Sequence, residues 1–508
     1  MAPIQIILLI MTVTFASPEL ALGGTQRALE SPWLLVLSVL GSYVSIVLIV
    51  GQRANAATRL LLNTTADANP IMFRIERLLS RARWATIALT AFFIYGLGWG
   101  VLVDHALSQR PVLGKVPMAD HLFMLLPPLL AWVWMWVFLY RVERAVHDRS
   151  VPYRLAQHLP VHEMPTLGQY VLLQVRHNFY MLVPVVFATM LDRLLREVIG
   201  WYAPQYAGYA AVVSVVAMLV IVPMLIVAMW STEPLVGDLR DRLAALARTY
   251  RIGYRKILIW RTHSHMTNAA ILGYLPFARY FLLTDALLET LSDRQIEAVF
   301  AHEVGHGKKR HIWWYAASVI GWMMLAIAAL GVVERLVPPQ LPDWLGGVKF
   351  EQAASLALLA LMAIFMGLIF PLISRRFEHQ ADWFAAQHMA KEAATEPLAN
   401  LAPQVITIDQ YTTGAHLVAS TNPLAAGAEV FISALDRIVE LSHRSRSRKG
   451  LMHPSINQRM DLLRRLADDE AARKKFDRMQ LRVRLFIAVV FLAGAAGVVW
   501  QMLPQTQP

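Results

Sequence analysis

The stretch from Ser292 to Val332 reads SDRQIEAVFAHEVGHGKKRH and then IWWYAASVIGWMMLAIAALGV, so a charged segment is joined directly to an apolar one. Ser292 and Gln295 have the spacing of a capping box, in which the serine hydroxyl accepts from the third helical amide and the glutamine side chain reaches back to the serine N–H. A helix is therefore expected from about Asp293, and no proline interrupts it. This pattern predicts one helix that leaves a polar domain and runs straight into a membrane span at 312–332.

The composition of the chain is that of a membrane protein. Of its 508 residues, 56% are hydrophobic and only 16% are charged. That is too little charge to cover a soluble globule of this length, and the composition also rules out a disordered chain. There is no cysteine. The sequence therefore excludes disulfides, thiolate nucleophiles and cysteine-bound zinc, and any metal site must use histidines and carboxylates.

Uninterrupted apolar stretches predict about eight transmembrane helices. Seven of them hold about twenty residues without a charge, enough to cross a hydrocarbon core of roughly 30 Å. An eighth, shorter stretch is needed for the topology to alternate. The ranges are 32–50, 84–103, 122–140, 209–230, 312–332, 353–373 and 485–503, with 178–191 as the shorter one. Residues 4–16 are either part of a signal peptide cut near Leu22-Gly23 or a retained hydrophobic segment.

The distribution of basic residues predicts the orientation in the membrane. If the first span enters from outside, residues 51–83, 141–177, 231–311 and 374–484 share one side and hold most of the 47 Lys and Arg residues. The positive-inside rule then places both long polar segments in the cytoplasm. We expect the spans themselves to lie in a plasma (inner) membrane. The net charge of +12 is thus explained without nucleic acid. The basic run 443–450 is expected to be a solvated loop near anionic headgroups.

The predicted fold class is mainly α, a polytopic membrane protein with a cytoplasmic domain that carries a small β-sheet. Residues 255–261 and 279–284 are short and rich in β-branched and aromatic side chains, which is typical of strands. We expect an N-terminal hydrophobic segment at 1–31, a transmembrane region of about five spans at 32–230, a polar domain at 231–484 that includes spans 312–332 and 353–373, and a C-terminal helix and tail at 485–508.

Two histidines on the predicted helix have metal-ligand spacing. In the sequence Ala301-His302-Glu303-Val304-Gly305-His306 the imidazoles are four residues apart, so they lie on one helical face and can share a Zn²⁺ ion. Glu303 lies beside them, placed to take a proton from a metal-bound water. The alternative is a chance match. Two histidines make an incomplete site, so a third ligand is required.

Helix geometry points to Glu378 as that ligand. His306 precedes the span 312–332 by six residues, about 9 Å along a helix. The loop 333–352 makes 353–373 the antiparallel neighbour of that span, and a ligand on the second helix should lie a similar distance past its cytoplasmic end. Glu378 lies five residues beyond that end.

The residues around Glu378 offer a supporting acceptor and two alternatives. Asp382 is four residues further on the same helical face and is predicted to accept from a ligand imidazole and so fix it. His379 points about 100° away and is the alternative ligand. The alternative for Glu378 itself is an ordinary ion pair with Arg375 or Arg376.

Three motifs resemble a family of membrane-bound zinc endopeptidases that includes the type I CAAX prenyl proteases and the heat-shock protease HtpX. They are NAAILGYLPFARYFLLTDALLETLSDRQIEAVFAHEVGHGKKRH, SRRFEHQAD and HPSINQRMDLL, which begin at residues 268, 374 and 453. The resemblance covers about 240–470, roughly half of the chain. It implies a gluzincin-like zinc peptidase domain within 231–484, with one Zn²⁺ per chain bound by His302, His306 and Glu378 and with Glu303 as the base.

The resemblance also implies roles for residues outside the helix pair. Asn268 matches an asparagine on an edge strand that holds substrate backbone as an added strand, although a turn asparagine is the alternative. His453 matches a histidine near the metal that could stabilise the oxyanion, and a residue at a helix start before Pro454 is the alternative. Arg459 is expected to pair with a carboxylate of the site.

The predicted function is zinc-dependent hydrolysis of peptide bonds in membrane proteins or lipid-anchored peptides. Zinc lowers the pKa of its water toward ~7, and Glu303 takes the proton and later passes it to the leaving amine. CAAX processing and general quality control are both compatible with this chemistry. The alternatives are a polytopic metal-binding protein or transporter without proteolytic activity, and an inactive scaffold. The clear spans hold no ionisable residue in their interiors, which counts against a transporter.

Overall fold

The computed structural model describes residues 29–64, 68–110, 112, 119–156, 161, 163–179, 182–263, 266–336, 350–395, 422–442, 446–447 and 450–503. The segment predicted at 4–16 lies outside these residues, as does most of the basic run 443–450. Contacts divide the chain into two compact units. One comprises residues 1–218, 323–366 and 494–508, and the other comprises 219–322 and 367–493. The predicted domain boundaries follow the order of the sequence instead and stay predictions.

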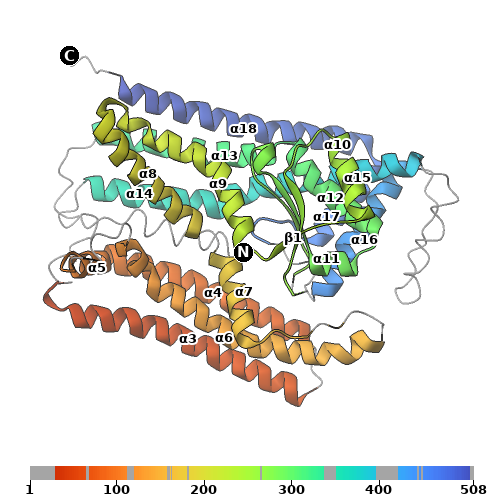
Figure 1. The fold of residues 1–508 in the computed structure, drawn as a ribbon, viewed down its shortest axis with the longest axis horizontal. Coiled ribbons are helices and arrows are strands. Elements are labelled where there is room, and N and C mark those ends of the chain that lie inside the picture. Colours follow the sequence, from red (N-terminus) through yellow and green to blue (C-terminus); the bar gives the residue numbers. More distant parts are fainter. Residues whose placement is uncertain are drawn as a thin grey trace. The chain divides into compact units, whose positions relative to one another are not determined.

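The first unit begins with a group of helices that includes α3, α4 and α6 (Figure 1), and polar side chains link these three helices. The Tyr43 hydroxyl lies 2.8 Å from Thr90 Oγ1, and Trp132 Nε1 donates to Thr86 Oγ1 at 2.7 Å. Because buried hydroxyl and indole groups need partners in apolar surroundings, these bonds fix the register of three helices. The elements up to residue 229 are α3 Pro32–Asn63, α4 Ala68–Ala91, the π-helical turn η2 Phe92–Gly96, α5 Trp99–Ser108, α6 Ala119–Ala156, α7 Leu167–Phe179, α8 Leu182–Tyr202, η4 Pro204–Tyr209 and α9 Ala210–Met229. The boundary between the units falls within α9.

Five helices among the described residues are long and apolar enough to cross a membrane, and a sixth span results if a pair bent by 67° counts as one. They are Pro32–Asn63, Ala119–Pro152, His311–Leu336, Ala353–Ala393 and Glu470–Gln501, with the bent pair Pro70–Gly96 and Trp99–Ser108. The mainly helical membrane fold is thus confirmed, and these helices cover six of the eight predicted ranges. The range 178–191 runs from the end of α7 into α8, and α8 carries the ion pairs Arg193–Glu197 and Arg196–Asp192. The range 209–230 falls on α9, which qualifies only as a shorter apolar helix.

The prediction that one helix continues from Asp293 into the membrane is wrong. Helix α12 (Asp293–Lys308) ends two residues before α13 (His311–Leu336) begins. Between them, Arg310 has a φ of 57°, a left-handed conformation that a continuous right-handed helix does not contain. The break places His311 on the first turn of a second helix.

Four strands form the small sheet in the order β1-β2-β4-β3. The predicted strands are confirmed as β2 (Lys256–Trp260) and β4 (Tyr280–Thr284), which pair in parallel. The sequence prediction missed β1 (Thr232–Pro234) and β3 (Ala269–Leu272), which pair antiparallel with β2 and β4. Strand β3 is therefore an edge strand of this sheet.

The sheet packs on both faces, and one face carries the helices of the site. Ile257 and Phe281 belong to a core that includes α12, whereas Leu258 and Leu282 pack with Val227 and its neighbours near the end of α9. The alternation follows from the period of two along a strand. The remaining elements are α10 Asp238–Thr249, η5 Pro276–Ala278, α11 Asp285–Thr290, α14 Phe350–Ile364, η7 Phe365–Ile369, α15 Phe370–Thr395, α16 Pro423–Ser442, α17 Ile456–Asp468 and α18 Glu470–Met502.

Candidate metal centre

Helix α12 is fixed at its start by a cap and along its length by close packing. The Ser292–Gln295 capping box predicted from the sequence is present in both directions. Gly305 faces α15 so closely that a Cβ there would lie 3.0 Å from Phe384 Cδ1. The glycine therefore lets α12 and α15 approach one another, and this contact brings their polar side chains together.

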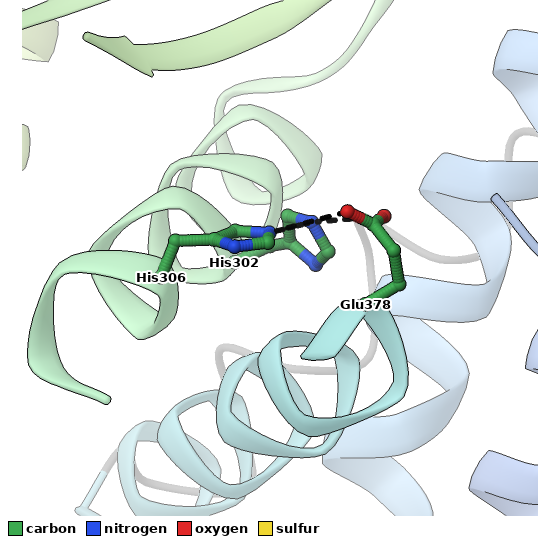
Figure 2. A group of neighbouring side chains, drawn as sticks. All are labelled: His302, His306 and Glu378. Carbon is green, nitrogen blue, oxygen red and sulfur yellow. Dashed lines mark hydrogen bonds and ion pairs between the residues drawn. The ribbon is translucent and has the colours of Figure 1, made fainter. Parts of the chain in front are cut away.

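Three predicted ligands meet between these helices, as Figure 2 shows. The Nε2 atoms of His302 and His306 are 3.1 Å apart. Glu378 Oε2 lies 3.9 Å from His302 Nε2, and Glu378 Oε1 lies 3.6 Å from His306 Nε2. One ligand atom from each residue lies within 4.8 Å of the other two. Two imidazoles and one carboxylate form a donor set that suits a divalent metal and leaves a coordination position open.

Asp382 connects the pair of helices to α17. Its Oδ1 lies 2.9 Å from His302 Nδ1. Arg459 donates from Nε to Asp382 Oδ2 at 2.8 Å and from Nη2 to Oδ1 at 2.5 Å. The side chain of Asp382 is 1% exposed. A buried carboxylate with a bidentate arginine is held in one orientation, so it can fix the ring of His302 in turn.

Burial and neighbouring charges act differently on the three titratable groups of α12. Burial raises the pKa of Glu303, with Glu378 adding to the rise and His302 opposing it. Burial lowers the pKa of His306 to about 4. Burial would also lower the pKa of His302, but Asp382 and the other carboxylates outweigh it, so the pKa is raised. The result is a neutral His306 beside a His302 that holds its proton more tightly.

The Glu303 carboxylate is oriented by the backbone of the edge strand. Its Oε2 accepts from the Ile271 N–H at 2.9 Å. In the antiparallel pairing of β3 with β4, Ile271 stands opposite Phe281. The Thr284 N–H donates to the Asn268 carbonyl three register positions earlier. Because hydrogen-bonded pairs alternate along an antiparallel ladder, the N–H of Ile271 points away from β4. This contact, which joins Glu303 to the edge strand of the sheet, was not predicted from the sequence.

Of the residues assigned by resemblance, His453 and Arg459 contact carboxylates of the centre, and Asn268 contacts the neighbouring strand β4. His453 Nδ1 lies 2.9 Å from Glu378 Oε2, and its side chain is 64% exposed. Asn268 directly precedes β3, and its backbone N–H donates to Thr284 Oγ1 at 2.9 Å. His379 Nδ1, the alternative ligand, lies 4.0 Å from Asp382 Oδ2 and does not belong to the three-residue group found among the described residues.

The fold and the site together define the class: a helical membrane protein with a metallopeptidase-type HExxH centre. Residues 235–467 match the family described as "Peptidase family M48". This match confirms the resemblance seen in the sequence, and it covers the helices α12, α15 and α17 that carry the site.

Curated relatives carry matching names. The chain is 27% identical over 160 residues to a "Protease HtpX homolog" of Aeropyrum pernix, which covers 31% of this chain and 48% of the relative. It is 27% identical over 202 residues to a "CAAX prenyl protease 1 homolog" of Arabidopsis thaliana, and this alignment covers 37% of this chain and 46% of the relative. The chain thus spans about half the length of the curated relatives it matches.

Among solved structures, the crystal structure of S. mikatae Ste24p aligns with 84% of this chain and 98% of its own, at 16% identity and a TM-score of 0.45. The apolar helices and the membrane-protease relatives indicate an integral membrane protein.

Proposed function

We propose that the chain is a zinc-dependent endopeptidase that cleaves membrane-associated protein substrates. The observation that carries the proposal is the convergence of His302, His306 and Glu378 beside the carboxylate of Glu303. The match of residues 235–467 to a peptidase family supports it. One ion per chain would be held by these three side chains, as the spacing of the residues predicts.

The chain's own residues would divide the chemistry among them. A zinc ion held by the three ligands would acidify water and polarise the scissile carbonyl. Glu303 would take the proton and give it to the leaving amine, since burial raises the pKa of this carboxyl and so makes its anion a stronger base. The exposed His453 would donate to the developing oxyanion. Asp382 would keep the His302 ring in place, with Arg459 holding Asp382.

The substrate would approach along the edge strand. Asn268 and β3 would hold its backbone as an added strand, a mode that uses the outward-facing N–H and C=O groups of a sheet edge. One of these groups, the Ile271 N–H, donates to Glu303. Helix α13 begins only five residues after His306, so the site would lie close to the lipid surface. We therefore expect juxtamembrane segments or lipid-anchored peptides as substrates, cleaved on the cytoplasmic side of a plasma (inner) membrane.

Replacing Glu303 with Gln should abolish cleavage of a membrane reporter, by a hundredfold or more, because general acid–base catalysis contributes about 10²–10⁴-fold. Zinc content should stay that of the unmodified chain, since all three ligands remain. Rates are measured on the full chain in lipid nanodiscs, with a juxtamembrane reporter and a prenylated C-terminal peptide as separate arms.

Glu297→Gln is the matched control, because it makes the same chemical change on the same helix but at a side chain paired with Arg242. It should retain full activity. Undiminished turnover in the Glu303→Gln variant would rule out the proposed base. A zinc-loaded native chain that cleaves neither reporter would favour the alternative, a metal-binding membrane protein without proteolytic activity.

A further inference from the structure

The two histidines of the centre are supported by chemically different partners. His302 is backed by the carboxylate of Asp382, whereas His306 is backed by a third imidazole: His306 Nδ1 lies 3.0 Å from His311 Nδ1. His311 is completely buried, with 0% of its surface exposed. A buried imidazole has to satisfy both of its nitrogens, and the second one makes the arrangement directional.

The protons in this chain of contacts can be assigned from one end to the other. Gln380 Oε1 lies 3.0 Å from His311 Nε2 and accepts from Arg484 Nη2 at 2.9 Å. An amide oxygen only accepts, so His311 must carry its proton on Nε2 and leave Nδ1 as an acceptor. The remaining partner, His306, must then donate from its own Nδ1.

This assignment leaves the Nε2 atom of His306 without a proton. That atom faces the Nε2 of His302 at 3.1 Å and the carboxylate of Glu378 at 3.6 Å, where a metal ligand is needed. Only an unprotonated imidazole nitrogen can bind a metal. The His311 tautomer therefore selects the one form of His306 that can serve as a ligand.

Packing holds the third imidazole in place. The ring of His311 stacks on Phe377 with centroids 4.5 Å apart and an interplanar angle of 2°. The guanidinium of Arg484, on α18, lies 5.8 Å from the ring centroid of Trp314. Phe377 and Gln380 on α15 contact the ring of His311 directly, and Arg484 on α18 holds Gln380. These contacts restrict rotation of the His311 side chain.

We propose that His311 is a positioning residue that orients His306 and sets its tautomer for metal binding, and that Gln380 and Arg484 set the tautomer of His311. The inference rests on the proposed zinc site and adds how the tautomer of His306 is set for metal binding. It also separates the two ligands: Asp382 gives His302 both orientation and negative charge, whereas His311 gives His306 orientation alone.

The test compares the zinc affinity of three forms of the full chain, measured by competition with a chromophoric chelator. His311→Phe keeps a flat ring that can stack on Phe377 but removes the acceptor, and zinc affinity should fall about tenfold to a hundredfold. His311→Asn is the rescue variant, because its amide oxygen can occupy the place of Nδ1, and its affinity should stay within a few-fold of the native value. The thermal midpoint of the zinc-free forms reports on folding.

Equal zinc affinity in the His311→Phe variant and the native chain would overturn the proposal, and so would an equal loss in the Phe and Asn variants. If the Phe variant does not fold, Gln380→Met replaces it, since loss of the amide oxygen frees His311 to adopt the other tautomer and should also weaken zinc binding. A native chain that binds zinc but cleaves nothing would refute the proposed function alone, because these comparisons measure affinity and not turnover.

Discussion

Each ionisable residue of the centre has a state that follows from its partners. Asp382 holds a proton on His302, whereas His306 is buried against groups that do not compensate for its loss of water, and its pKa falls to about 4. The two ligands therefore differ in what they must give up when a metal binds. A ligand nitrogen has to be free of its proton, so metal affinity depends on pH through whichever histidine is protonated.

Zinc binding should therefore displace about one proton, not two, between pH 5 and 6.5. The raised pKa of His302 means that this ring is protonated in the window, while His306 is already neutral. The logarithm of the apparent zinc association constant should rise with pH with a slope of about 1 and level off once the pH passes the pKa of His302. Chelator competition across this range measures the slope.

Asp382→Asn provides the control for this prediction. Without the carboxylate, burial dominates and lowers the pKa of His302, so the sloping region should move to lower pH. A slope of about 2 in the native chain over the same window would show that His306 also carries a proton and would contradict the assignment.

At the scale of elements, the close contact between α15 and α16 determines where α16 places the side chain that packs on His302. Gly427 on α16 lies so close to α15 that a Cβ there would be 2.4 Å from the Ala386 carbonyl oxygen and the Ala390 nitrogen. These are backbone atoms, so a Cβ at this position could be accommodated only if the helices moved apart. Phe431, one turn further on α16, stacks against His302 with centroids 5.6 Å apart. A displaced α16 would therefore disturb a ligand.

Gly427→Ala should lower the free energy of unfolding by about 1–3 kcal/mol, the usual effect of overpacking a tight contact, and should weaken zinc binding. Gly41→Ala is the matched control on α3, because nothing lies within 4 Å of a Cβ at that position. There, better helix propensity should stabilise the chain slightly, by up to about 1 kcal/mol. Thermal midpoints with and without zinc measure both effects. A neutral Gly427→Ala would mean that the two helices separate freely.

The sequence predicts elements well where the signal is local and misses those that depend on tertiary contacts. The capping box at Ser292 and strands β2 and β4 could be read from neighbouring residues. Glu378 was inferred from the spacing of the predicted spans 312–332 and 353–373, and it lies beside His302 and His306, although the helix that the inference assumed to be continuous is broken at Arg310. Strand β3, whose sequence is only AAIL, exists because β4 pairs with it.

The break between α12 and α13 explains the residue that the sequence analysis missed. On a continuous helix, a residue five positions after His306 would point to a different face and could not contact it. The left-handed Arg310 turns the chain between them, and so His311 returns to His306. No local signal marks this position, since arginine is an ordinary helix residue.

For the whole molecule, the division into two compact units predicts that only part of the chain responds to the metal. All three proposed ligands lie in the unit that comprises 219–322 and 367–493, whereas the hydrogen-bonded residues Tyr43, Thr86 and Trp132 belong to the other. Zinc at about 1,000 times its Kd should stabilise the native form of the first unit by roughly 4 kcal/mol through mass action. Calorimetry of the full chain in detergent should thus show two transitions, of which one moves to lower temperature when a chelator removes zinc.

Trp132→Phe assigns the second transition. It removes the indole N–H that donates to Thr86 and leaves a buried hydroxyl with one partner fewer, which destabilises by about 1–3 kcal/mol. In this variant, the transition that is insensitive to the chelator should shift to lower temperature, and the temperature of the zinc-dependent transition should not change. A single transition that shifts with both zinc and Trp132→Phe would mean that the units unfold together. In that case the elements α9, α13, η7 and α18, within which the chain passes from one unit to the other, transmit the stability of the metal centre to the entire molecule.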